Sequence, residues 1–203
     1  MSNIFFTSDT HFGHENIRKY CPRTRPYMSR HEMDEDMISR WNSAVGQYDT
    51  VYHMGDFSWG RYEDIYKVLK RLNGIVHLTL GNHDQDIIKN RDRLDANAIM
   101  PCALAGTFAS IKDYREVSID GRKVVMMHFP LAVWHKNHYG AFHVFGHCHG
   151  SFEGFGKSMD VGWDTNNLGP AHVPGPIPWS KVERYLNSRE PKILDHHEPQ
   201  TQR

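Results

Sequence analysis

Side chains that commonly bind metal ions recur along this chain, each group directly after a short apolar run. In order, the groups are Asp9 and His11, Asp56, Gly81-Asn82-His83-Asp84, His128, and His147-Cys148-His149. Any one of them, taken alone, is explained by a polar turn or by an ordinary surface histidine. Five in succession indicate a shared site, because imidazole and carboxylate are the ligands of divalent ions such as Mn²⁺, Fe²⁺ and Zn²⁺.

The spacing within two of these groups indicates which side chains act together. Alternate residues of an extended segment share a face, so Asp9 and His11 can point the same way. In an extended His147-Cys148-His149 segment, Cys148 faces away from its two neighbours, and we therefore exclude it as a ligand. A site without thiolates is unlike a structural zinc site.

The chemistry that such an inventory can perform is metal-assisted hydrolysis. A carboxylate such as Asp56 can bridge two cations, which otherwise repel one another at the roughly 3.5–4 Å spacing of two-metal sites. A bridged pair lowers the pKa of a shared water and neutralises phosphate oxygens during in-line displacement. A phosphoester is the substrate class that makes most use of this arrangement.

In the first half of the chain, strands are expected to alternate with helices. Apolar runs predict strands at residues 4–6, 50–54 and 75–80. Ser29 and Glu32 form a capping-box pattern for a helix that ends at Gly46, and a second helix spans residues 65–72. In open α/β sheets, ligand sites lie beyond the carboxyl ends of strands, where the ligand groups fall.

The second half is expected to be mostly strands. Asp120-Gly121 predicts a hairpin between residues 114–119 and 123–127, and further strands are expected at 142–145 and 158–163. A weaker helical stretch covers residues 86–94, residues 170–178 read as a Pro/Gly-rich loop, and Ser180 with Glu183 predicts a capped helix over 179–189. The order of elements indicates a layered α/β domain.

Length and composition are those of one ordinary globular domain. The chain has 203 residues, of which 39% are apolar and 24% charged, and its net charge is zero. We expect a domain over residues 1–190 and a polar tail over 191–203, in which His196-His197 is incidental. No run is long enough to span a membrane, and no basic leader precedes the first strand. Three cysteines without a framework are read as reduced thiols of a cytoplasmic protein.

A basic loop at residues 16–31 is the candidate substrate-contacting region. It carries five Arg or Lys residues interleaved with two tyrosines and has no acidic residue. A solvated basic face is the commoner explanation, but His14, Arg23 and Arg25 are retained as candidate substrate-binding residues. His53, Trp59, His135 and His138 also lie near motifs, where packing explains them at least as well.

The five motifs together resemble the calcineurin-like metallophosphoesterase superfamily, and the segment from Ser8 to Asn16 resembles its small phage and bacterial branch. The resemblance implies two packed β-sheets flanked by helices in four α-β-β-α layers. It also implies two metal ions, one held by Asp9, His11 and His149, the other by Asn82, His128 and His147, with Asp56 bridging them. By the same resemblance, His83 stabilises the transition state or protonates the leaving oxygen, and Asp84 orients His83.

The resulting expectation is a phosphoesterase acting on a phosphomonoester or small phosphodiester, with a nucleotide among the candidates. Attack by a hydroxide that bridges two divalent ions is expected, with manganese preferred over iron, zinc or nickel. A nuclease is the first alternative, favoured by the basic loop and disfavoured by the zero net charge. A catalytically silent metal-binding protein of the same fold is the second. No membrane partner is expected, and substrate and oligomeric state are left open.

Overall fold

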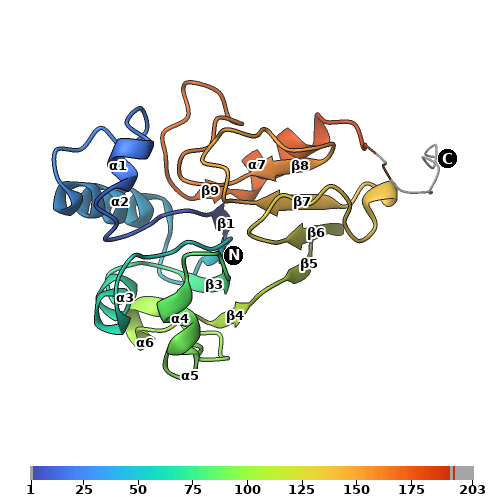
Figure 1. Cartoon of the computed structure of the whole chain (residues 1–203). Helices are drawn as coiled ribbons and strands as arrows, with labels where there is room; N and C mark the ends of the chain where they lie inside the picture. The colour runs from blue at the N-terminus through green and yellow to red at the C-terminus, as the bar shows by residue number, and fades with distance from the viewer. Residues whose placement is uncertain (1, 193, 195–203) are drawn as a thin grey trace.

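The computed structural model describes residues 2–192 and 194, and it contains two β-sheets with helices around them (Figure 1). The first sheet has the strand order β4-β3-β2-β1-β9, and all strands are parallel except β9, which pairs antiparallel with β1. Its strands are β1 (Ile4–Thr7), β2 (Thr50–His53), β3 (Ile75–Thr79), β4 (Ser110–Lys112) and β9 (Ile177–Pro178). Parallel strands end at one edge of the sheet, so the residues that follow β1, β2 and β3 meet there.

The second sheet has the order β5-β6-β7-β8 and begins with the predicted hairpin. Its strands are β5 (Arg115–Ile119), β6 (Arg122–Met126), β7 (Phe142–Phe145) and β8 (Ser158–Asp160). Asp120 and Gly121 both have positive φ values, 49° and 77°, as a two-residue turn of this kind requires. Strands β6, β7 and β8 are parallel, so the segments after β6 and β7 also leave from one edge.

Two apolar cores hold these layers together. Helices α2 (Arg30–Ala44) and α3 (Tyr62–Leu69) pack on one face of the first sheet, where Phe5 of β1 is buried with them. Phe6, the next residue, points into the core between the two sheets, which helix α7 (Trp179–Asn187) also joins. Residues 129–141, including the short helix η1 (Asn137–Tyr139), lie beside the second sheet and bury Trp134. The predicted architecture of two packed sheets flanked by helices is confirmed.

The predicted cap of α2 is confirmed, whereas the predicted cap of α7 is wrong although the helix begins at Trp179 as expected. The Ser29 hydroxyl accepts a hydrogen bond from the Glu32 backbone N–H at 3.1 Å, as a helix cap does. Helix α7 instead begins directly after Pro178, and Ser180 lies inside its first turn without capping it. The ring of Pro178 fixes the backbone φ at the entry to the helix, and no side chain of the described residues caps this end.

Several short elements were not predicted. Helix α1 (Ile17–Tyr20) lies in the basic loop, and α6 (Cys102–Ala105) and β4 follow later. The predicted helical stretch at residues 86–94 is present but divides into α4 (Gln85–Lys89) and α5 (Arg91–Leu94). A helix of four residues is too short to show hydrophobic periodicity. Strand β9 lies in the Pro-rich run, which an edge strand tolerates. The expected tail beyond residue 191, with His196 and His197, falls almost entirely outside the described residues. Within the described part of the chain, no helix combines the length and apolar character needed to cross a membrane.

Candidate metal centre and active site

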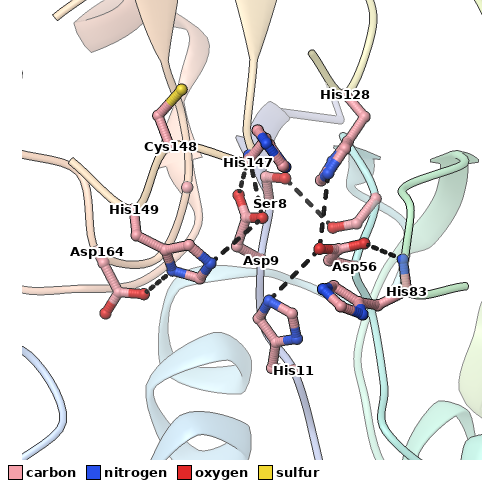
Figure 2. Close-up of polar contacts among 12 residues, drawn as sticks. Ser8, Asp9, His11, Asp56, His83, His128, His147, Cys148, His149 and Asp164 are labelled. Atoms are coloured by element: carbon pink, nitrogen blue, oxygen red, sulfur yellow. Dashed lines mark hydrogen bonds and ion pairs between the residues drawn. The ribbon is translucent and has the colours of Figure 1, made fainter. Parts of the chain in front are cut away.

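The side chains predicted to bind metal converge between the ends of the two sheets (Figure 2). Asp9 and His11 follow β1, Asp56 follows β2 and Asn82 follows β3, all from the first sheet. His128 and the segment of His147 and His149 follow β6 and β7 of the second sheet. The sheets are joined here, because Ser8 pairs with Gly162 and accepts a backbone hydrogen bond from Trp163 at 2.9 Å. Residues up to 140 positions apart therefore share one site.

One group consists of Asp9, His11 and His149, whose ligand atoms lie within 4.8 Å of one another. Asp9 and His11 are buried, and the His149 Nε2 atom is 3.9 Å from the Asp9 carboxylate. The same carboxylate accepts the His147 backbone N–H at 3.0 and 2.9 Å, which ties the loop after β7 to the end of β1. These three residues are those that the sequence resemblance assigns to the first ion.

A second group surrounds the amide oxygen of Asn82. This Oδ1 atom is 2.9 Å from His128 Nε2 and 3.0 Å from His147 Nδ1. The other ring nitrogen of His128 donates to the Met54 carbonyl at 2.8 Å, so the Nε2 atom presents its lone pair to Asn82. An imidazole lone pair and an amide oxygen that face one another are well suited to sharing a cation.

Asp56 lies between the two groups. Its Oδ2 atom is 3.5 Å from His11 Nε2 and 3.6 Å from His128 Nε2, one nitrogen from each group. Its Oδ1 atom accepts the backbone N–H of His83 at 2.8 Å. Asp56 also forms a compact cluster with Asp9 and His128. This position fits the predicted role of a bridging carboxylate.

The electrostatics of these residues also fit divalent cations. The Nε2 atom of His11 is buried and has no hydrogen-bond partner among the residues that the structure describes. Burial and the nearby His149 lower the pKa of His11 to about 2, so its imidazole is neutral and keeps a free lone pair. Burial raises the pKa of Asp9 well above its ordinary value, although His149 opposes this. A buried carboxylate beside an unsatisfied imidazole nitrogen is stabilised when a cation binds both.

Backbone strain is concentrated at the same residues. Eight non-glycine residues have positive φ within the described ranges, and five of them are predicted ligands. These five are Asp9 (54°), His11 (48°), Asp56 (54°), His147 (69°) and His149 (47°). A left-handed conformation costs roughly 1–2 kcal/mol per residue, and such strain gathers at functional sites. The strained turns aim the side chains of each loop inward.

Glycines let two of these loops approach closely. A Cβ atom on Gly81 would lie 2.2 Å from the Asp56 carboxylate, and one on Gly146 would lie 2.0 Å from the Ser8 hydroxyl. Both distances are far inside van der Waals contact, so no larger residue fits without displacing the site. The glycine before Asn82 therefore allows close packing against Asp56.

The predicted partnership of Asp84 with the His83 ring is wrong. Asp84 is buried, and its two oxygens accept the backbone N–H groups of Gly81, Asp56 and Phe57 at 2.7–2.9 Å. A carboxylate aimed into its own turn holds the loops after β2 and β3 together and cannot also reach the imidazole. His83 is exposed, and no residue in the described part of the chain hydrogen-bonds to its ring. Its ring centre lies 5.2 Å from that of Trp59 and 5.6 Å from that of His11.

Asp164 orients His149, and the sequence interpretation missed it. Its carboxylate accepts from His149 Nδ1 at 2.8 Å, which leaves Nε2 facing Asp9. Burial alone would lower the pKa of His149, but the bonds to Asp164 and Cys21 raise it to about 10. Carboxylate partners of this kind fix the ring orientation of metal-binding histidines. The signal was an acidic residue directly after the predicted strand 158–163.

Arg25 is the buried partner of Asp164, and its predicted contact with substrate is wrong. Its guanidinium lies 2.9 Å from the Asp164 carboxylate and donates to the carbonyls of Asp9 and Thr10 at 2.6 and 2.9 Å. Only 1% of Arg25 is exposed. The pair holds the pKa of Asp164 below its usual range against the effect of burial. Arg25 thus joins the basic loop to the end of β1 and does not face solvent.

The remaining candidates fall into three environments. His14 lies beside the site, with its ring 5.5 Å from His11 and 4.3 Å from Trp59, and its Nδ1 atom accepts the Ile17 N–H. Arg23 is exposed and donates to Asn166 at 2.8 Å. His53, the last residue of β2, is buried beside Trp41 and Phe57, and its Nε2 atom lies 2.9 Å from the Thr10 hydroxyl. Substrate contact by His14 and Arg23 stays a prediction.

Comparison with known proteins now defines the class. The model of the calcineurin-like phosphoesterase family matches residues 2–202, so the chain belongs to that family. An uncharacterised protein of Methanocaldococcus jannaschii, MJ1445, is 40% identical over 87 residues, which are 42% of this chain and 48% of that protein. Gene 66 protein of Mycobacterium phage D29 is 28% identical over 171 residues, which are 73% of this chain and 79% of that protein.

The solved structure of AQ665 from Aquifex aeolicus, a protein of unknown function, has the same fold. Its TM-score is 0.66 at 22% identity, over 91% of this chain and 99% of that one. The chain spans about half the length of MJ1445 and 44% of that of the L5 phage relative, also a gene 66 protein. Membership of the calcineurin-like phosphoesterase family agrees with the clusters of candidate metal ligands among the described residues.

Proposed function

We propose that the protein hydrolyses a phosphomonoester or a small phosphodiester with the help of two divalent cations. The observation that carries the proposal is the arrangement of two ligand groups on either side of Asp56, whose Oδ2 atom is 3.5 Å from His11 and 3.6 Å from His128. Asp9, His11 and His149 would hold one ion and Asn82, His128 and His147 the other, with Asp56 shared. Manganese is the preferred ion, with iron, zinc or nickel as alternatives.

When bound, such a pair of ions activates water for attack and neutralises charge on the phosphate. The chain's own residues supply the remaining functions. Buried Asp9 and Asp56 provide the negative charge, and Asp164 and the Met54 carbonyl fix which nitrogen of His149 and of His128 faces the site. Asp84 holds the turn of residues 81–84 in place through backbone N–H groups.

His83 is the proposed proton donor. Its backbone is fixed by Asp56, while its ring is exposed and has no hydrogen-bond partner among the described residues. An imidazole in this position can protonate the leaving oxygen as the phosphorus–oxygen bond breaks. The roles of His83 and of Asp84, which acts by positioning, belong to this proposal.

The substrate is proposed to be small. Two of the five basic side chains of the loop at 16–31 are paired with carboxylates, because Arg25 is buried against Asp164 and Arg18 pairs with Glu15 at the surface. The basic surface that favoured a nuclease is correspondingly smaller. We also propose one catalytic unit over residues 1–190 and, because Cys21, Cys102 and Cys148 are unpaired, a cytoplasmic location.

A substrate panel tests the proposal. Phosphomonoesters, phosphodiesters and cyclic nucleotides are assayed with Mn²⁺, Zn²⁺, Mg²⁺, Fe²⁺ and Ni²⁺ after the protein has been stripped with a chelator. We expect metal-dependent hydrolysis of at least one ester class and none in chelator. A metal-loaded protein that is inactive on the whole panel would instead support the silent metal-binding alternative.

A further inference from the structure

A cavity of about 400 Å³ opens beside His83 and shares Asn82 with the second ligand group. We define the Trp59 pocket as this cavity. Its lining residues are Ser58, Trp59, Gly60, Arg61, Asp64, Asn82, His83, Gln85 and Asp86. Its volume lies within the range of about 300–1,000 Å³ that is usual for small-molecule sites. Through Asn82 and His83 it is continuous with the metal centre.

A half-exposed aromatic ring forms one wall of the pocket. Trp59 is 49% exposed, and its ring centre lies 5.2 Å from that of His83 and 4.3 Å from that of His14. His14 meets the indole edge-on and His83 at a tilt, while about half of Trp59 stays exposed. A large aromatic surface that is held in place but uncovered can stack on a planar ligand group at low entropic cost.

The polar side chains around Trp59 are largely uncommitted. Gln85 makes one long hydrogen bond, at 3.5 Å to the Asn82 carbonyl, and Asp86 has one distant ion pair, at 3.9 Å to Lys89. Arg61 is exposed, and its guanidinium has no partner in the described ranges. Amide, carboxylate and guanidinium groups together offer both donors and acceptors to the edge of a ring. A ligand with a phenyl ring, which has no polar atoms at its edge, could not form hydrogen bonds with these groups.

The charges of the pocket show which part of a substrate it fits. It contains Arg61 against Asp64 and Asp86, so its formal charge is negative. A phosphate is therefore better placed at the cations than in the pocket, which suits an uncharged heteroaromatic group. On the basis of the proposed function, we infer that the Trp59 pocket binds the nucleoside of a nucleotide ester, with its base stacked on Trp59.

The position of the pocket also assigns the direction of cleavage. It borders His83, so the group that it holds is the one whose oxygen receives the proton. Water adds to phosphorus, the bond between phosphorus and the nucleoside oxygen breaks, and His83 gives that oxygen its proton. The products are a nucleoside and a phosphate, or a phosphate monoester when the substrate is a diester.

Binding of adenosine tests the inference without any hydrolysis, with ribose as the probe that lacks a base. Calorimetry on the full chain should show that adenosine binds and ribose does not. Stacking of a base on an aromatic side chain contributes about 1–3 kcal/mol, so Trp59→Ala should weaken adenosine binding about ten-fold. Trp59→Phe, which keeps a ring, should weaken it less than Trp59→Ala. Tyr48→Ala, which removes a 63% exposed ring elsewhere, is the matched control.

Kinetics give the second readout. For the parent protein, kcat/KM should be higher for adenosine 5′-monophosphate than for ribose 5-phosphate. If the enzyme prefers diesters, the same difference should hold between the methyl esters of these two compounds. Trp59→Ala should lower this ratio about ten-fold. Both substrates depend equally on His83, so a variant that only damages catalysis lowers both kcat/KM values and leaves their ratio unchanged. An unchanged ratio in Trp59→Ala would therefore overturn the inference.

Other results would also overturn it. Equal binding of adenosine by Trp59→Ala and the parent would do so, as would a preference for a phosphotyrosine peptide over every nucleotide. The proposed function fails separately. If no ester is hydrolysed but adenosine still binds through Trp59, the pocket is a nucleoside site on a protein with another function.

Discussion

The two ligand groups and the Trp59 pocket share Asn82 and adjoin His83, yet their side chains are held in opposite ways. Around Asp56, the carboxylates and imidazoles are mostly buried, and their free atoms are few and point at one another. Around Trp59, side chains are exposed and have few partners. This difference suggests that the two regions serve two functions, cleavage of the bond and choice of the substrate. Bond breaking depends on fixed geometry, whereas choice of substrate depends on a surface that a few substitutions can change.

The largest effect is expected from Asp56→Ala, which alters the two ligand groups. Asp56 touches both ligand groups and the His83 backbone, so its removal should lower kcat/KM on the order of 10³-fold or more and reduce the metal content. Rates and bound metal are measured together. The exposed Asp113, replaced by Ala, is the control. Retention of parental activity by Asp56→Ala would remove the bridging role.

The next effect is expected at the boundary of the two regions. His83→Ala should lower kcat about 10²-fold or more, because the leaving oxygen loses its proton donor, while the metal content stays parental. An ester of p-nitrophenol, whose leaving group needs little protonation, should be affected less. Equal losses on both kinds of ester would argue against proton donation, and full activity would exclude any catalytic role.

A buried pair outside the ligand groups offers a third test. Asp164→Asn should weaken metal binding about 10–100-fold, since His149 loses the carboxylate that orients it. It should also lower the free energy of unfolding by about 3 kcal/mol, because Arg25 stays buried without its counter-charge. The double variant Asp164→Asn/Arg25→Met should recover part of the stability but not the metal affinity. Parental affinity in both variants would show that Asp164 has no influence on the metal centre.

The pH dependence of the free energy of unfolding tests the burial of His143 in the second sheet. His143 is fully buried, donates to the Val125 carbonyl and accepts the Leu131 N–H, and burial lowers its pKa to about 4. The unfolded chain therefore takes up a proton first as the pH falls below the ordinary value of 6.5, and the free energy of unfolding decreases between about pH 6.5 and 4. His143 alone should account for about 2 kcal/mol between pH 7 and 5.

Urea denaturation in chelator, for the parent and His143→Gln, measures this contribution. Glutamine keeps a donor and an acceptor but does not titrate, so its stability should fall less steeply with acid. Identical slopes for the two proteins would contradict the assignment to His143.

The smallest effect is expected at the basic loop. Arg23 is exposed, and a single exposed charge contact with the substrate is worth at most about 1 kcal/mol, so Arg23→Ala should raise KM by no more than about five-fold. Kinetics at several salt concentrations provide the check. A larger rise in KM, together with steep loss of binding at high salt, would favour a long nucleic acid as substrate.

The sequence predicted the positions of those candidate ligands that directly follow a strand, because the apolar run before them marks the end of the strand. Asp9, Asp56, Asn82, His128 and His147 each follow a recognisable apolar run, and the parallel order of the strands brings them together. The sequence was uninformative where the partner is distant. The bond between Arg25 and Asp164 joins residues 139 positions apart, so an arginine in a basic loop looked like a surface residue.

The direction in which a side chain points could not be predicted from the sequence either. Adjacency indicated that Asp84 supports the ring of His83, but the turn directs its carboxylate to three backbone N–H groups. The short strand β9 and helix α1 were missed because tertiary contacts, not periodicity, define them. Trp59 lay near a motif, yet its exposure and the cavity beside it depend on how the loops after β2 and β3 meet.

An anomalous-scattering map of crystals grown with Mn²⁺ would show whether two ions bind on either side of Asp56. We predict two peaks on either side of Asp56, one among Asp9, His11 and His149, the other among Asn82, His128 and His147. The described residues also include a cluster of Cys21, His149 and Asp164 that could hold an ion. A single peak at that cluster, or none beside Asp56, would contradict the account.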